Sequence, residues 1–180
     1  ALCSDAELDQ ESGEAVGEPT ECALVNDACK NGMPKPQLKA EYERIGEAPF
    51  DSMRKMMSTV HRTREGKIVQ FTKGAPDEVL KRCSRAWVNG AAVPLTDAMR
   101  REILEGNKGM ADRALRVLCG SMRLWEQEPE SYEPENLEQD LIYLGLSGMI
   151  DPVRPEVKAA IVECGEAGIR PIMITGDHKD

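Results

Sequence analysis

Aromatic residues are scarce in this chain: they make up 4% of its 180 residues, whereas hydrophobic residues together make up 41%. We therefore expect a core of aliphatic, methionine and alanine side chains. Basic residues are in the minority too, since 23 Lys and Arg stand against 32 Asp and Glu, with a formal net charge of -9. This balance argues against binding of nucleic acid, whose backbone requires a basic stripe, but a locally positive pocket could still hold a nucleotide.

Several motifs are absent as well. No apolar run is long enough to cross a bilayer and no signal peptide is present, so we expect the chain itself to be soluble. No GxxxxGK[ST] motif occurs, which sets a P-loop kinase aside. The cysteines form no CxxC pair and have no nearby histidine that would complete a zinc set, so we expect no metal site. Reduced, buried thiols of a cytosolic protein fit them better than a disulfide framework. The six are Cys3, Cys22, Cys29, Cys83, Cys119 and Cys164.

The ends of the sequence are unusual for a complete protein. It opens on Ala1-Leu2-Cys3 without a methionine, and it stops at Thr175-Gly176-Asp177-His178-Lys179-Asp180, directly after an apolar stretch that reads as a strand. A strand of an α/β sheet normally delivers its chemistry at its carboxyl end. We therefore expect a piece of a longer protein.

Local patterns predict a mixed set of helices and strands. The polar segments 4–18 and 126–140 are expected as surface loops, and a proline-containing link is expected before residue 42. Helices are predicted to begin at Glu18-Pro19, at Ala75 and after Thr96. Strands are predicted over 42–50, 56–62, 67–73, 115–124 and 141–150, with an Asn-Gly hairpin over 87–93.

The pattern changes from Leu141 onward. The apolar strand 141–150 leads into Asp151-Pro152-Val153-Arg154-Pro155, then into an amphipathic helix, and then into a fully apolar strand over 169–174 that is typical of a buried parallel sheet. These elements predict a strand–helix–strand piece of a second, α/β architecture. We place the domain boundary near Asp151, which gives domains 1–150 and 151–180.

The stretch Phe71-Thr72-Lys73-Gly74-Ala75-Pro76 is the centre of the predicted site. Phe71 and Lys73 share one face of a strand, and Gly74 lets the backbone turn or lets a ligand approach closely. Antiparallel pairing of 56–62 with 67–73 would bring Phe50 and Lys55 to the same edge. An aromatic face with two cations suits an adenine ring and its phosphates; the alternative is a core phenylalanine and two surface lysines.

Five blocks of sequence, in this order, resemble the cytoplasmic part of P-type cation-transporting ATPases, most closely the calcium-pump-like group. The resemblance covers nearly the whole chain, and Leu115-Arg116-Val117-Leu118 adds a sixth, weaker block. The five are Gly17-Glu18-Pro19-Thr20-Glu21, Phe50-Asp51-Ser52-Met53-Arg54-Lys55, Lys73-Gly74-Ala75-Pro76, Asp151-Pro152-Val153-Arg154 and Met173-Ile174-Thr175-Gly176-Asp177.

This resemblance implies an α+β nucleotide-binding domain over 1–150, an antiparallel sheet flanked by helices, incomplete at its N-terminus. Residues 151–180 would be a strand–helix–strand fragment of the Rossmann-like, haloacid-dehalogenase phosphorylation domain. The parent would be an integral membrane pump, with this part on the cytoplasmic side. It would couple ATP hydrolysis, through an aspartyl-phosphate, to transport of a cation, calcium by overall similarity. The partners implied are ATP and the remaining phosphorylation, actuator and transmembrane domains.

The resemblance also implies roles for single residues in nucleotide binding. Phe50 would stack on adenine, and Glu21 would accept from, or orient a group near, the adenine edge. Lys55 and Lys73, with Gly74 beside them, would line the pocket, and Arg116 would reach the phosphates. Calcium-type members commonly have an arginine where this chain has Ser52, a gap that Arg54 could fill.

Catalytic roles fall in the last part of the chain. Asp151 and Arg154 would mark the hinge beside the transferred phosphate, and Thr175, Gly176 and Asp177 would help to hold the phosphoryl group. The family's DKTGT and GDGxND blocks, which supply the phosphorylated aspartate and Mg²⁺ ligands, do not occur in this sequence. Because phosphoryl transfer depends on positioned groups and metal charge, we expect this chain to bind ATP without turning it over, with the Mg²⁺ ligands mostly outside it.

Two other functions stay open on the residues alone. One is a stand-alone nucleotide-binding or interaction module without a transport role, which the parent sequence around this segment would distinguish. The other is a soluble haloacid-dehalogenase phosphatase with a large cap, which would use the missing aspartate without needing this nucleotide pocket.

Overall fold

A seven-stranded sheet forms the body of the structure. The computed structural model describes residues 1–9, 11–150 and 154–172. In spatial order the strands are β3 (Tyr42–Asp51), β4 (Met56–Thr63), β5 (Ile68–Gly74), β8 (Arg116–Trp125), β9 (Leu141–Met149), β6 (Cys83–Val88) and β7 (Ala91–Pro94).

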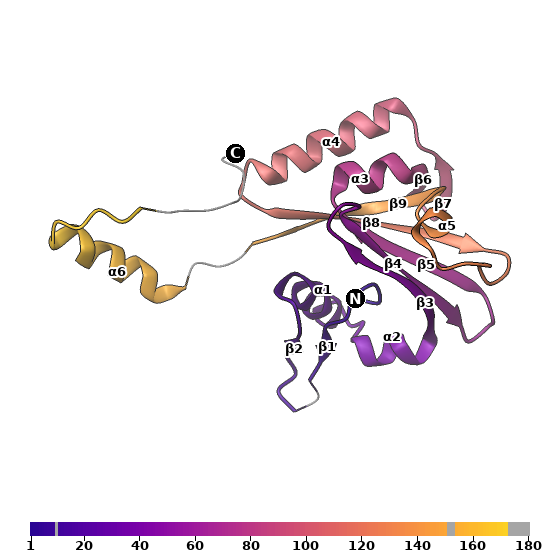
Figure 1. Ribbon diagram of the computed structural model, residues 1–180, viewed down its shortest axis with the longest axis horizontal. Helices are drawn as coiled ribbons and strands as arrows, with labels where there is room; N and C mark the ends of the chain where they lie inside the picture. The colour runs from indigo at the N-terminus through magenta and orange to yellow at the C-terminus, as the bar shows by residue number, and fades with distance from the viewer. Residues whose placement is uncertain (10, 151–153, 173–180) are drawn as a thin grey trace.

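Helices cover both faces of this sheet, which confirms the predicted α+β class (Figure 1). None of the helices in the described ranges is long and apolar enough to cross a membrane. Over one face lie α3 (Pro76–Arg82) and α4 (Asp97–Ala111), and over the other lie α1 (Pro19–Lys30), α2 (Lys35–Glu41) and the short strands β1 (Glu7–Leu8) and β2 (Ala15–Val16).

The strand over 141–149 does not open a second unit, and this corrects the predicted strand–helix–strand piece. β9 pairs antiparallel with β8 and parallel with β6, in the register Cys83↔Leu141. The sheet is therefore antiparallel apart from this one pair. The predicted helix forms as α6 (Pro155–Glu166). Residues 169–172 are not in a strand, and the rest of the strand predicted over 169–174 lies outside the described residues.

Local signals correctly predicted where several elements begin and turn. The Glu18 carboxylate caps α1 by accepting from the N–H of Thr20 at 2.9 Å and of Glu21 at 3.3 Å. Thr96 Oγ1 caps α4 through the N–H of Met99 at 3.3 Å. Asn89 and Gly90 have φ angles of 50° and 83°, as the tight turn between β6 and β7 requires.

Three segments predicted as loop or link contain regular structure. Segment 4–18 holds the β1–β2 pair, and the proline-containing link forms α2, in which proline occupies the first turn without losing a hydrogen bond. Segment 126–140 holds α5 (Pro134–Leu137). The expectation that 126–140 is solvated surface holds for most of its residues but was wrong for Leu137 and Glu138, which are 0% and 3% exposed.

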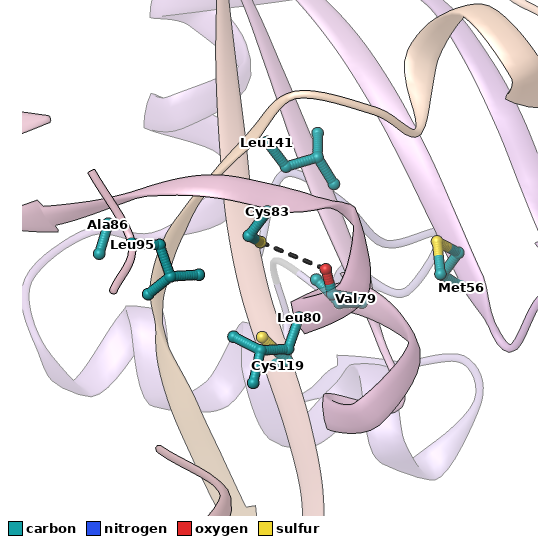
Figure 2. Packing of buried hydrophobic residues seen from close by; sticks show 8 residues of the cluster. All are labelled: Met56, Val79, Leu80, Cys83, Ala86, Leu95, Cys119 and Leu141. Atoms are coloured by element: carbon teal, nitrogen blue, oxygen red, sulfur yellow. Dashed lines mark hydrogen bonds between the residues drawn. The ribbon is translucent and has the colours of Figure 1, made fainter. Parts of the chain in front are cut away.

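The larger core cluster lies between the sheet and the α3–α4 layer and contains no aromatic residue, as the composition predicted. Cys83 Sγ donates to Val79 O at 3.2 Å within it (Figure 2). Burial raises the pKa of Cys83 and of Cys119 to about 12, so both thiols stay protonated. All six cysteines are free, as expected, but burial was predicted correctly only for half of them, since Cys22, Cys29 and Cys164 are partly exposed. The cluster comprises Met56, Val79, Leu80, Cys83, Ala86, Leu95, Cys119 and Leu141.

A second cluster joins segment 126–140 to the outer strands of the sheet. It consists of Ala48, Val60, Ile68 and Leu137, with Ile45, Trp125 and Tyr132 packed against it. Gly46 makes room for Tyr132, because a Cβ at this glycine would lie 2.2 Å from the tyrosine ring. The acidic segment is therefore part of the packed structure.

A buried histidine should make the fold sensitive to acid. His61 is 1% exposed, and burial lowers its pKa to about 4. In the unfolded chain histidine titrates near pH 6.5, so the unfolded state binds a proton that the folded state excludes between these values. The contribution of His61 to the free energy of unfolding should be complete above pH 6.5. Below that pH the free energy of unfolding should fall, by up to about 1.4 kcal/mol per pH unit from this residue, until the pH reaches about 4.

Urea denaturation of the wild type and of His61→Gln at several pH values measures this effect. The variant should show a shallower loss of stability below pH 6.5. Equal pH slopes in the two proteins would contradict the prediction.

Candidate functional site

A cavity of about 700 Å³ opens at the end of β5, between the start of α1 and the turn that joins β3 to β4. The start of β8 closes a further side. Its walls are Asp5, Ala6, Gly17, Glu18, Thr20, Glu21, Phe50, Lys55, Met57, Lys73, Gly74, Ala75, Pro76, Arg116, Val117 and Leu118.

The sequence prediction that Phe50, Lys55 and Lys73 converge is confirmed, because all three line this cavity. The β4–β5 ladder is responsible: Met57 pairs with Lys73, and the N–H of Ala75 donates to Lys55 O at 2.9 Å. Phe50 is 63% exposed, so its ring has a face open to a ligand.

Phe71 does not join this group. Its ring packs against those of Tyr42 and His61, with centroid distances of 6.3 and 5.8 Å. It faces a separate cavity of about 270 Å³ under α1 and α2, which it shares with Lys73. The expectation that Phe71 would stand at the same edge as Phe50 was therefore wrong.

Gly74 is needed for close packing of two strands. Its φ is not in the left-handed region, so the predicted turn is not the reason for a glycine. A Cβ there would lie 2.4 Å from Lys55 O and 2.5 Å from Met56 Cβ. Any larger residue would push away the backbone that carries Lys55.

Glu21 and Lys73 form an ion pair inside the cavity wall, with side chains 14% and 13% exposed. Glu21 Oε2 also accepts from the N–H groups of Asp5 at 2.7 Å and Ala6 at 3.0 Å. Burial by itself would raise the pKa of Glu21, but the hydrogen bonds from Lys73 and from these backbone groups hold the pKa below its usual value. The carboxylate therefore ties the N-terminal segment to β5.

Comparison with known proteins shows the family of this chain. The sequence profile of the family described as P-type ATPase, cytoplasmic domain N, matches residues 1–156. The chain belongs to this family. Calcium-transporting ATPase 1 of Bacillus cereus is 48% identical over 179 residues, which cover 99% of this chain and 20% of that protein.

More distant relatives match in the same way. The calcium-transporting ATPase of Bacillus subtilis is 42% identical, over 100% of this chain and 20% of that protein. Human plasma membrane calcium-transporting ATPase 4 is 36% identical, over 91% of this chain and 14% of that protein. This domain N thus spans about a fifth, or less, of the length of these relatives.

Besides Lys73, two cations border the cavity of this domain N, Lys55 and Arg116. Arg116 Nη1 donates to Thr20 Oγ1 at 3.0 Å, which joins β8 to α1. In the described part of the chain, neither Arg116 nor Lys55 has a carboxylate within 4.0 Å. Their charge is available to an anion. Ser52 does not line the cavity, and Arg54 points to Glu138 instead of filling the gap.

A buried lysine that sequence reasoning missed supports the N-terminal wall. Lys35 is 3% exposed, and its Nζ donates to Ser4 O at 2.9 Å and to Ala6 O. Burial lowers the pKa of Lys35, although Glu7 at 3.6 Å opposes this. No sequence signal distinguishes this lysine from a surface lysine in a proline-containing link.

Of the residues predicted to be catalytic, Arg154 alone falls within the described residues. Asp151, Thr175, Gly176 and Asp177 lie outside the described residues. Arg154 is exposed at the N-cap of α6 and does not line the cavity. Within the described ranges, no group of three or more His, Cys, Asp and Glu residues could hold a metal ion.

Proposed function

We propose that this domain N binds ATP in the 700 Å³ cavity, as the nucleotide-binding part of a cation-transporting P-type ATPase. Calcium is the proposed ion because the relatives cited are named as calcium-transporting. The observation that carries the proposal is one exposed aromatic ring, Phe50, beside two cations, Lys55 and Arg116, that have no carboxylate partner among the described residues.

The physical character of the cavity supports this ligand. Its volume lies within the roughly 300–1,000 Å³ that is usual for small-molecule sites. Met57, Val117 and Leu118 supply apolar surface for a purine, whose face can stack on Phe50. Lys73 is paired with Glu21, so the polyanionic part of a nucleotide is best accommodated near Arg116 and Lys55.

Replacing Phe50 by alanine tests the pocket assignment. The variant should bind ATP about 1–2 kcal/mol more weakly, which corresponds to the loss of one base–aromatic stack. Titration calorimetry measures the dissociation constant directly. Met53→Ala is the matched control, because Met53 is 87% exposed in the same turn and does not line the cavity. Equal ATP affinity in Phe50→Ala and the wild type would remove the assignment.

We also propose that this chain binds nucleotide without turning it over. The parent pump would transfer the γ-phosphoryl group to an aspartate, but the sequence lacks the family's DKTGT and GDGxND blocks. Among the described residues, no group of three or more His, Cys, Asp and Glu side chains could form a metal site made by the protein alone. Incubation with γ-labelled ATP and Mg²⁺ should leave the protein unlabelled and release no phosphate. Label on the chain would contradict the proposal.

The family match favours a pump over the two other functions considered. A capped phosphatase and a stand-alone module each leave unexplained why 99% of this chain matches a segment of a calcium-transporting ATPase, a segment that makes up 20% of the Bacillus cereus relative. The parent sequence on either side would distinguish a pump from a stand-alone module. Transmembrane segments and a phosphorylated aspartate there would support the pump.

A further inference from the structure

The turn between β3 and β4 carries two residues that line the cavity, Phe50 and Lys55, and is closely bonded within itself. Asp51 Oδ1 accepts from the N–H groups of Met53 and Arg54, both at 2.9 Å. The N–H of Lys55 donates to Asp51 O at 2.7 Å, and Lys55 has a φ of 56°. These bonds define the shape of the turn.

The two ends of the turn are attached to the sheet in different ways. The β4 end accepts a hydrogen bond from the N–H of Ala75 at 2.9 Å. At the β3 end the ladder shifts register between Ala48 and Asp51, so Phe50 itself has no ladder pair, although Asp51 beside it pairs with Met56. The step that carries Pro49 and Phe50 is held by the ladder only on either side, and a side-chain attachment would fix it in between.

Arg54 supplies that attachment. Its Nη2 donates to the carbonyl of Pro49 at 2.7 Å, directly before Phe50, and its Nη1 donates to the carboxylate of Glu138. The guanidinium is a planar fork that can hold two acceptors at once, which a lysine ammonium on one flexible stem cannot do with the same geometry. The two acceptors come from positions far apart in the chain.

Glu138 is a rigid anchor for this fork. Its side chain is 2% exposed, and the backbone around it is held by side chains of the sheet. Gln70 Nε2 donates to Leu137 O at 2.9 Å, and Arg123 Nη1 donates to Gln139 O at 3.1 Å. Side chains of β5 and β8 thus hold the backbone on either side of Glu138, Glu138 binds Arg54, and Arg54 binds the backbone before Phe50.

We propose that Arg54, bridged to Glu138, is a positioning residue that holds the Phe50 ring at the cavity, so that segment 126–140 sets the affinity for the purine base. Arg54 itself does not line the cavity. This inference rests on the proposed function, because it assumes that Phe50 contacts the bound nucleotide.

The mildest variant that breaks the bridge is Arg54→Lys. It keeps a positive charge beside the buried Glu138 carboxylate, which avoids the large cost of an unpaired buried charge. It should raise the dissociation constant for ATP about three- to tenfold, as expected for one lost orienting hydrogen bond. Arg62→Lys is the matched control, since Arg62 also ties segment 126–140 to the sheet, through Glu128 at 2.7 Å, but does not contact the turn. It should leave the dissociation constant unchanged.

A double-mutant cycle separates positioning from a general loss of structure. If Arg54 acts through Phe50, Arg54→Lys should have no further effect on ATP binding in the Phe50→Ala background. An additive effect would overturn the inference. If Phe50→Ala itself leaves the affinity unchanged, the proposed function is overturned and this inference falls with it. If Phe50→Ala weakens binding and Arg54→Lys does not, the inference alone is overturned.

The position of the ring can also be observed without nucleotide. The chain has two phenylalanines, so incorporation of fluorophenylalanine gives two fluorine resonances, from Phe50 and Phe71. Arg54→Lys should shift or broaden the Phe50 resonance, while Phe71, packed against Tyr42 and His61, serves as the internal reference. A Phe50 resonance identical to that of the wild type would overturn the inference, whatever the ATP affinity.

Discussion

Replacing Leu137 by alanine should lower the free energy of unfolding by about 2–5 kcal/mol, the usual cost of deleting a fully buried leucine side chain. Leu137 is 0% exposed and packs with Ala48, Val60 and Ile68. It is also the residue whose carbonyl accepts from Gln70 Nε2, so its surroundings cannot easily collapse into the space left behind. Poor relaxation around a cavity places the cost toward the upper part of this range.

Urea denaturation followed by tryptophan fluorescence measures this loss, because Trp125 packs against the same cluster. Leu124→Ala is the control, since Leu124 is 59% exposed on β8, next to Trp125. Its effect should stay within about 0.5 kcal/mol, as for surface substitutions in general. Equal stability of the two variants would mean that segment 126–140 is surface loop, as the sequence suggested.

Lys73→Ala should affect both the stability of the domain and its affinity for ATP. The side chain of Glu21 is 14% exposed and would lose its cation, at a cost of about 1–3 kcal/mol for a buried acceptor left with fewer partners. The wall formed by Asp5 and Ala6 would be held less firmly, because Glu21 Oε2 accepts hydrogen bonds from both of their N–H groups. ATP should bind about 1–2 kcal/mol more weakly through loss of a charge-assisted contact and of this wall.

The stability loss in Lys73→Ala should depend on pH. Lys73 helps to hold the pKa of Glu21 below its usual value, so the pair stabilises the fold above the unfolded carboxyl pKa, and this contribution is lost as pH falls through the lowered value. The variant and the wild type should therefore differ most near pH 7 and converge in acid. Lys67→Ala provides the control, because Lys67 forms an ion pair with Glu65 on the exposed β4–β5 turn and does not line the cavity. Unchanged ATP affinity and stability in Lys73→Ala would remove Lys73 from the site.

Part of the candidate site could be predicted because it depends on contacts close in sequence. The β4–β5 hairpin spans residues 56–74, and antiparallel pairing alone places Lys73 opposite Met57 and near Lys55. The position of Phe50 near these lysines could be predicted from the same hairpin, because only a short turn separates Phe50 from the start of β4. Glu21 and Arg116 entered through the likeness to P-type ATPases, since no local pattern connects α1 or β8 with β5.

Other parts could not be predicted, because their partners are distant in the chain. Glu138 pairs with Arg54 across 84 residues, and Lys35 reaches Ser4 across 31. A buried charge looks the same in sequence as a solvated one, so the acidic segment 126–140 was predicted as surface. The parallel β6–β9 pair was not predicted either, for a different reason: the apolar run 141–150 suits a strand of a parallel or an antiparallel sheet.

The helix caps, the tight turns, the aliphatic core and the hairpin that brings Phe50, Lys55 and Lys73 together follow from the order of the amino acids. These features depend on interactions between residues a few positions apart, which side-chain type and spacing specify. Long-range packing, in contrast, sets which charges are buried, why residue 74 is a glycine and how Arg54 bonds the turn to Glu138. A charge is stable away from water only beside a fixed partner, and packing of the whole chain determines where that partner lies.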